Sequence, residues 1–142
     1  MKVSARNVFK GTVSAVVEGA VNAEVVLALP GGDSLVAVVT LQSVKSLGLA
    51  VGKQAIALIK APWVMLMTEG SDIRLSARNC LQGTVASITE GAVNAEVALA
   101  LPGGAQITAM VTREAVKELG LAIGVPATAV IKASHIILGV PA

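Results

Sequence analysis

The stretch EGAVNAEVVLALPGGDSLVAVVT, residues 18–40, decides how this chain folds, because in it each of two turns is followed by an apolar segment. Residues 24–29 and 35–39 are rich in Val, Leu and Ala, and each is long enough for one short strand. The sequences Gly-Ala-Val-Asn at 19–22 and Pro-Gly-Gly at 30–32 contain the residues that favour turns. The stretch therefore predicts neighbouring strands joined by hairpins.

The residues on either side of this stretch predict a small barrel. Residues 8–17, rich in β-branched side chains, predict a strand before the first turn. Thr40 has a suitable side chain for the N-cap of a brief helix that stops at Gly48. Two further strands, 54–60 and 63–67, are expected to close the unit. Five strands with a small helix between the third and fourth is the order of an oligonucleotide/oligosaccharide-binding (OB) type barrel.

The whole unit occurs twice. A shift of 72 residues places EGAVNAEV of 18–25 on the identical residues 90–97, and the copies align from Ser4 to the end without insertion. Two copies of this length predict a duplicated domain, since solenoid repeats are shorter and more numerous. We therefore predict an all-β chain of two tandem OB-like five-stranded barrels, each with one short helix. The expected domains are 1–68 and 74–142, joined by a short linker, 69–73.

The composition predicts extensive apolar contacts. The chain is 54% hydrophobic and 14% charged, whereas roughly a quarter of the residues in an ordinary soluble domain are charged. A barrel of this size buries too little of its own surface to be comfortably stable alone, so we expect apolar contacts between barrels and between chains. Pro-Gly-Gly at 102–104 and scattered charges interrupt every apolar run, and residues 1–7 contain no export signal. We expect a cytoplasmic protein with no membrane partner.

Catalytic motifs are nearly absent. There is one histidine and one cysteine, and we find no phosphate-binding loop, no paired carboxylates and no repeated Ser/His/Asp set. We predict that the chain is not an enzyme and has no catalytic residues. Cys80 is expected to be buried in the packing, and His135, which matches Trp63 in the first copy, to pack or lie at the surface. The aromatic residues Phe9 and Trp63 are too few to stack nucleic-acid bases, so no nucleic-acid partner is expected.

Both copies repeat a set of hydrogen-bond donors. The set comprises Ser, Arg and Asn of SARN at 4–7 and 76–79, Thr40 and Thr112, Lys45 and Lys117, Lys60 and Lys132, and both Gly-Ala-Val-Asn turns. An ionised oxyanion needs such donors, because all its oxygens accept hydrogen bonds. Singly, each has a structural alternative: Arg6 and Lys60 could be solvated strand ends paired with Glu24 or Asp33. Their joint repetition favours an oxyanion site.

At these residues the sequence resembles a known family. SARN followed by GTV, then EGAVNAEV, VVT and IKAPWV, resembles the Mop family of molybdate-binding domains, and the tandem pair resembles a di-Mop molbindin. The resemblance covers essentially the whole chain. It implies barrels of the Mop/TOBE type and cytoplasmic storage or homeostasis of molybdate, and similarly tungstate, with no catalytic cofactor. It also implies a homotrimer with anions held between barrels.

The resemblance also implies two classes of binding residue. The SARN/KAP class comprises Ser4, Ala5, Arg6, Thr40, Ser43, Lys60 and Ala61, and in the second copy Ser76, Ala77, Arg78, Thr112, Lys132, Ala133 and Ser134. The threefold class comprises Ala20, Val21, Asn22, Ala92, Val93 and Asn94, through backbone amides. The second copy departs from the pattern, since Ala115 replaces the Ser43 hydroxyl and Ser134-His135 replaces Pro62-Trp63. We expect either one weaker class of interface or a hydroxyl restored by Ser134.

Three other functions stay open. Within the family, the chain could be a molybdate-sensing or transport-accessory module, although SARN begins at Ser4 and we expect no DNA-binding or ATPase domain before it. Outside the family, it could be an oligomeric scaffold whose donors are structural, or an oligonucleotide-binding barrel. Binding and storage of the oxyanion is the function that the repeated donors favour.

Overall fold

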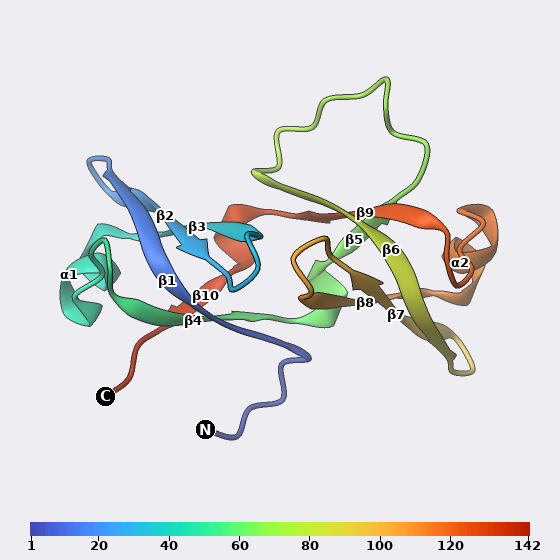
Figure 1. Ribbon diagram of the computed structural model, residues 1–142, viewed down its shortest axis with the longest axis horizontal. Coiled ribbons are helices and arrows are strands. Elements are labelled where there is room, and N and C mark those ends of the chain that lie inside the picture. Colours follow the sequence, from blue (N-terminus) through green and yellow to red (C-terminus); the bar gives the residue numbers. More distant parts are fainter.

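The computed structural model describes all 142 residues, which form two lobes of strands (Figure 1). The first half contains β1 (Asn7–Glu18), β2 (Asn22–Ala28), β3 (Ser34–Thr40), α1 (Leu41–Leu47), β4 (Gln54–Ile59), the 3₁₀ turn η1 (Ala61–Trp63) and β5 (Met65–Met67). The second half repeats this order as β6 (Asn79–Glu90), β7 (Asn94–Ala100), β8 (Gln106–Thr112), α2 (Arg113–Glu118), β9 (Pro126–Ile131), η2 (Ala133–His135) and β10 (Ile137–Gly139). The predicted order of strands and helix is confirmed.

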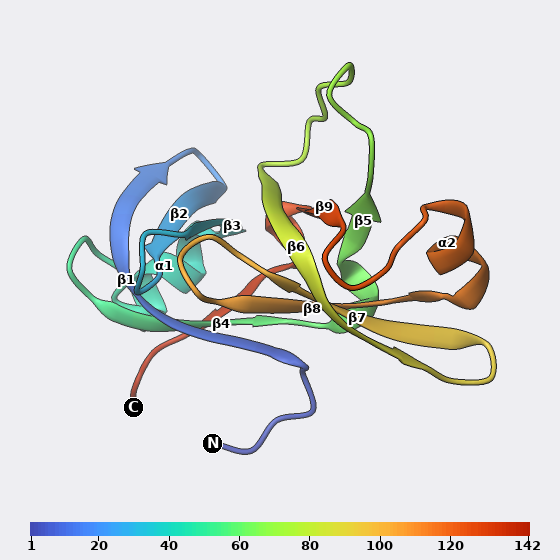
Figure 2. The same ribbon diagram turned by 45° about the vertical axis from the view of Figure 1, so that its right-hand side comes forward.

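Each sheet takes its outermost strand from the other half of the chain. The two strand orders are β10-β4-β1-β2-β3 and β5-β9-β6-β7-β8. Met65 lies opposite Val130, and Ile137 lies opposite Leu58. Figures 1 and 2 show the chain crossing between the lobes after β4 and again after β9. The two lobes therefore exchange their last strands.

This exchange corrects the prediction that residues 63–67 close the first barrel. Residues 61–63 form the turn η1, which packs beside β8 of the other lobe, so the chain leaves its own sheet immediately after β4. Only residues 65–67 form the strand, and they complete the second sheet. Each sheet contains strands from both halves of the chain, so the limits 1–68 and 74–142 do not divide the two sheets and stay a prediction about the sequence repeats.

Alternating side chains build the core. In β2, Ala23, Val25 and Leu27 are buried, while the residues between them are more exposed. One continuous apolar cluster joins such residues from both lobes, and a side chain removed from water in this way contributes stability in proportion to its apolar area. The predicted apolar contact between the barrels is confirmed.

The Pro-Gly-Gly turns meet at the boundary between the lobes. A Cβ atom at Gly31 would collide with the carbonyl oxygen of Gly103, and one at Gly103 would lie 2.7 Å from the Gly31 carbonyl oxygen. The Gly103 N–H donates to Asp33 Oδ2 at 3.0 Å. The repeated glycines therefore form turns and also allow two backbones to touch, which larger residues would prevent.

Of the two remaining local predictions, the helix cap at Thr40 is confirmed and the burial of Cys80 is wrong. The Thr40 Oγ1 accepts a hydrogen bond from the Ser43 N–H at 3.0 Å, and α1 ends at Gly48 with φ of 64°, as the capping pattern predicted. Cys80 was expected to be buried but is exposed. The buried residue at this end of β6 is its neighbour Asn79, and successive side chains of a strand point to opposite faces. No helix is long and apolar enough to span a bilayer.

Candidate anion-binding site

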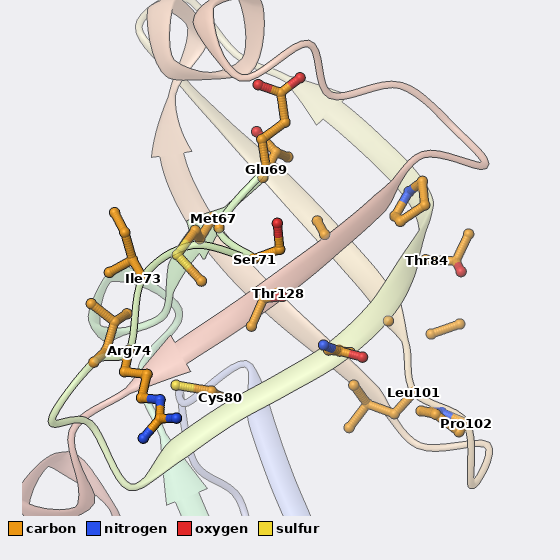
Figure 3. A pocket seen from close by; sticks show the side chains of 18 residues that line it. Met67, Glu69, Ser71, Ile73, Arg74, Cys80, Thr84, Leu101, Pro102 and Thr128 are labelled. Carbon is orange, nitrogen blue, oxygen red and sulfur yellow. The ribbon is translucent and has the colours of Figure 1, made fainter.

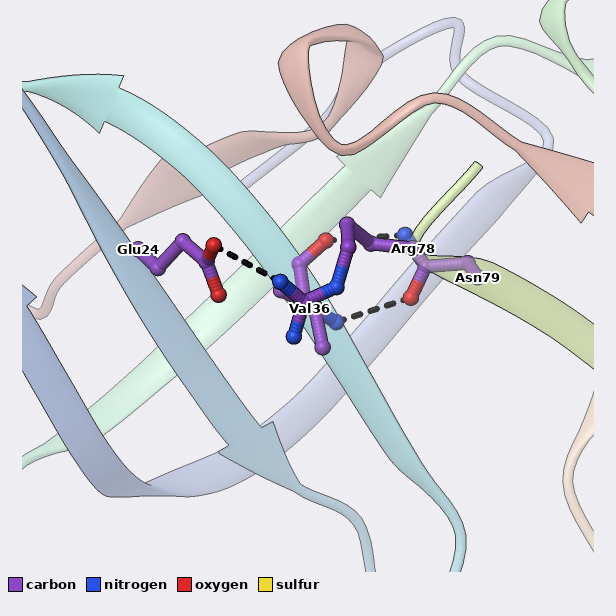
Figure 4. A network of polar contacts seen from close by, with 4 residues as sticks. All are labelled: Glu24, Val36, Arg78 and Asn79. Atoms are coloured by element: carbon purple, nitrogen blue, oxygen red, sulfur yellow. Dashed lines mark hydrogen bonds and ion pairs between the residues drawn. The ribbon is translucent and has the colours of Figure 1, made fainter. Parts of the chain in front are cut away.

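The asparagine of each SARN segment connects the two lobes. Asn79 is 2% exposed and forms two 2.8 Å hydrogen bonds with the backbone of Val36 in β3, accepting from its N–H and donating to its carbonyl (Figure 4). Its Nδ2 also donates to the Ile131 carbonyl at 3.3 Å. Asn7 makes the equivalent bonds to Thr108 at 2.7 and 2.8 Å and to Ile59 at 3.2 Å. Each side-chain amide thus pairs with a strand of the other sheet.

The arginine of each SARN segment forms an ion pair across the same boundary. Arg78 Nη1 lies 2.8 Å from Glu24 Oε2, and Arg6 Nη2 lies 3.0 Å from Glu96 Oε2. Figure 4 shows Arg78 reaching from its segment to Glu24 on β2. Glu24 and Asp33, the carboxylates that the sequence offers as partners for Arg6, do not pair with it. Both arginines pair with the second glutamate of the EGAVNAEV motif in the opposite copy.

Six predicted residues of the second copy line one cleft. The cleft has a volume of about 600 Å³ and is lined by Ser76, Ala77, Arg78, Lys132, Ala133 and Ser134. Val38 of β3 and Met65 of β5 supply an apolar wall from the other half of the chain. Two cationic and two hydroxyl side chains therefore share a site with the composition that suits a small oxyanion.

The hydroxyls of Thr40 and Ser43 lie in a second, neighbouring cleft. It has a volume of about 320 Å³, and its lining includes Asn22, Thr40, Ser43 and Ser134. Thr40 Oγ1 donates to Ser43 Oγ at 2.8 Å. Ser134 lines both clefts, because the turn η2 packs beside β3. Thus the hydroxyl pair of the first copy meets the Lys132–Ser134 segment of the second copy.

The other predicted residues lie outside both clefts. Ser4, Ala5, Arg6, Lys60, Ala61 and Thr112 line neither of them. Thr112 caps α2, accepting from the Ala115 N–H at 3.0 Å. The Lys60 Nζ lies 5.5 Å from the centroid of the Trp63 ring, and that ring lies 5.4 Å from the His135 ring. Of the two roles expected for His135, the structure therefore shows packing, and the residue it packs against is Trp63, its counterpart in the other copy.

The threefold-class residues lie at the tips of two hairpins. Residues 20–22 and 92–94 are exposed, with Val21 at 72% and Val93 at 70%. Each turn is closed by a backbone hydrogen bond from its glycine. The Gly19 N–H, for example, donates to the Asn22 carbonyl at 2.8 Å. A single chain does not test whether three such turns surround an anion, so this assignment stays a prediction.

The largest of these three clefts lies elsewhere. It has a volume of about 1110 Å³ and lies between the looped segment after β5 and the face of the second sheet (Figure 3). Arg74, Cys80 and Thr128 line it together with Met67 and other apolar residues. None of the predicted binding residues lies there, and its lining shows no cluster of cationic donors. Size alone therefore does not identify the anion site.

Together, the fold and the clefts define a class of protein, a pair of small barrels with exchanged strands and donor-lined sites at their boundary. Both halves match the family model described as TOBE domain, over residues 3–66 and 75–138. The chain belongs to the TOBE domain family. The predicted fold class and the resemblance to Mop domains are confirmed by this match and by the relatives described next.

Relatives with similar sequences carry molybdenum-related names. The molybdenum-pterin-binding protein MopA of Rhodobacter capsulatus is 52% identical over 141 residues, and the molybdenum transport protein ModE of Azotobacter vinelandii is 49% identical over 140 residues. Both alignments cover 99% of this chain but only 53% and 52% of the relative. The chain thus spans about half the length of the curated relatives it matches.

A solved structure matches the chain over its whole length. It is the cytoplasmic molybdate-binding protein ModG in a form with molybdate bound. The match has a TM-score of 0.95 and 69% sequence identity, and it covers 99% of this chain and 100% of that one. At this similarity the overall backbone of the two proteins is the same, including the relative placement of both lobes.

Proposed function

We propose that this chain binds molybdate in the cytoplasm and serves its storage or homeostasis. The observation that carries the proposal is the cleft at Arg78 and Lys132, where predicted donors converge. The 69% identity to ModG, whose structure holds molybdate and which is described as cytoplasmic, supports the same ligand and compartment. The role is binding rather than catalysis, with neither nucleic acid nor membrane as a partner.

Selectivity for molybdate follows from the chemistry of the donors. Molybdate is a tetrahedral dianion whose four oxygens only accept hydrogen bonds, and the cleft offers Arg78, Lys132, Ser76 and Ser134 as donors. Phosphate usually carries a proton at neutral pH, and an unpaired O–H costs about 1 to 3 kcal/mol. Sulfate is smaller and reaches fewer donors at once. Tungstate has the shape and charge of molybdate and is expected to bind similarly.

We propose that a complete site needs a second barrel. Six of the residues predicted for the second copy line one cleft, while Thr40 and Ser43 line a separate one. The corresponding set of the first copy comprises Ser4, Ala5, Arg6, Lys60 and Ala61. In the second copy, Thr112 is the counterpart of Thr40. Packing of chains into a homotrimer would bring such partial sets together and would place residues 20–22 and 92–94 on the threefold axis. Anions bound between chains would then stabilise the assembly by mass action.

Native mass spectrometry tests the proposal. The protein is mixed in separate experiments with molybdate, sulfate and a short single-stranded oligonucleotide, each at micromolar concentration. We expect a trimer that gains mass with molybdate and not with sulfate or the oligonucleotide. Equal uptake of sulfate, or no uptake of molybdate, would contradict molybdate storage, and uptake of the oligonucleotide alone would favour a nucleic-acid-binding barrel.

The residue assignment is tested by replacing Arg6 and Arg78 together with alanine. The doubly substituted protein should lose the SARN-class sites and keep the threefold sites, so titration calorimetry should show fewer molybdate ions per trimer. Arg74→Ala is the matched control, because Arg74 is an arginine of the looped segment outside the predicted sites. An unchanged number of bound ions in the double variant would refute the assignment.

The lengths of the ModE and MopA relatives support a second candidate, the molybdate-sensing or transport-accessory half of a larger protein. Mass spectrometry of the natural protein from its source cells separates the two. A mass close to that of 142 residues would favour storage, and a mass about twice as large would favour the sensor.

A further inference from the structure

Both SARN arginines are held by a carboxylate at the edge of the proposed binding region. Glu24 lies directly opposite Val38 in the β2–β3 ladder, and Val38 lines the cleft that also contains Arg78. The ion pair of 2.8 Å therefore joins a residue that lines the cleft, Arg78, to one beside it, Glu24. The same arrangement recurs in the first copy, where Glu96 lies opposite Met110 and pairs with Arg6 at 3.0 Å.

The carboxylate is the fixed member of each pair. Glu24 lies on β2, which is hydrogen-bonded to strands on both sides, whereas Arg78 lies in the segment that precedes β6. The Glu24 side chain is 34% exposed and that of Arg78 is 54% exposed. An anion that enters the cleft thus reaches the guanidinium more easily than it reaches the carboxylate.

The ion pairs are not needed to hold the lobes together. A pair with this degree of exposure contributes little to stability, and the lobes are already joined by the exchanged strands β5 and β10 and by the buried amide of Asn79. Another role is required to explain why both copies place a negative charge beside a cation of the proposed anion site.

We propose that Glu24 and Glu96 are internal counter-anions, which compete with the oxyanion for the arginines Arg78 and Arg6. The inference rests on the proposed function. Without Glu24, the cleft would carry two positive charges, from Arg78 and Lys132; with it, the net charge is reduced by one. The carboxylate therefore weakens binding of a dianion and orients the guanidinium toward the boundary between the lobes. The result is a site from which molybdate can be released.

The test is a titration of molybdate into variants at one glutamate. Glu24→Gln keeps the shape of the side chain and removes its charge, so it should tighten binding at the Arg78 site by about three- to tenfold at low salt. Because salt screens charges, the difference should shrink as ionic strength rises. Glu24→Asp keeps the charge and should bind molybdate within about twofold of the wild type, as expected for retained electrostatics.

Glu118→Gln is the matched control, because it changes the net charge of the protein by the same amount. Glu118 lies at the C-terminal end of α2 and belongs to none of the ion pairs. Its affinity should equal that of the wild type. Weaker or unchanged binding by Glu24→Gln would overturn the inference, and so would equal tightening by Glu118→Gln, which would indicate an effect of total charge. Failure of the wild type to bind molybdate would instead overturn the proposed function, so the two failures are distinguishable.

Discussion

Replacing Asn79 by alanine should lower the free energy of unfolding by about 3 kcal/mol, because three hydrogen bonds of about 1 kcal/mol each are lost. Two of them join Asn79 to the backbone of Val36 at 2.8 Å, and the third reaches the Ile131 carbonyl at 3.3 Å. Asn79 is only 2% exposed, so water cannot easily replace the amide. The loss should therefore be close to the full sum.

Urea unfolding at one fixed protein concentration measures this loss, since assembly makes stability depend on concentration. Asn7→Ala should lose a similar amount, because its bonds of 2.7, 2.8 and 3.2 Å match those of Asn79. Gln106→Ala is the control: its exposed side chain lies at the start of β8 and outside both classes of predicted binding residue, and substitutions at such surface positions usually change stability by less than about 0.5 kcal/mol. If Asn79→Ala lost no more than Gln106→Ala, the asparagine would not connect the lobes as we describe.

Two further predictions concern the boundary between the lobes. Cleavage at a protease site inserted into residues 69–73 should leave one particle by native gel filtration and two fragments on a denaturing gel, because β5 and β10 stay paired with the opposite half; separation of the native halves would contradict the exchange. His135→Ala should shift the fluorescence of Trp63 to longer wavelength, because loss of the ring at 5.4 Å admits water; an unchanged spectrum would contradict the stacking.

The strands and turns could be predicted from sequence because local chemistry specifies them. The runs of Val, Leu and Ala in residues 24–29 and 35–39 and the glycines between them leave few other conformations. The exchange of β5 and β10 could not be predicted, because β4 and β9 have similar sequences and offer chemically equivalent edges. Which edge Met65 to Met67 join depends on the direction in which η1 leaves β4, and no side-chain pattern specifies that direction.

The donors of the candidate site could be predicted from their repetition, but their grouping could not. Thr40 and Ser43 meet Ser134 rather than Lys60 of their own copy, and this follows from the packing of η2 beside β3. Asn7 and Asn79 belong to the repeated donors, but neither class of predicted binding residue includes them. In the sequence, the only sign of their role is an asparagine at the first position of a strand. Asparagine is also typical of turns, so only the partner strand in the structure reveals what its side chain does.

The exchange of strands also affects how the two repeats can change over evolutionary time. A substitution in Met65 to Met67 is inherited with the first repeat, but its side chains must fit the sheet built by the second. The reverse holds for Ile137 to Gly139. Each repeat therefore supplies part of the environment in which the other is selected, and neither can drift freely. The unit of duplication and the unit of folding differ in this chain by one strand in each direction.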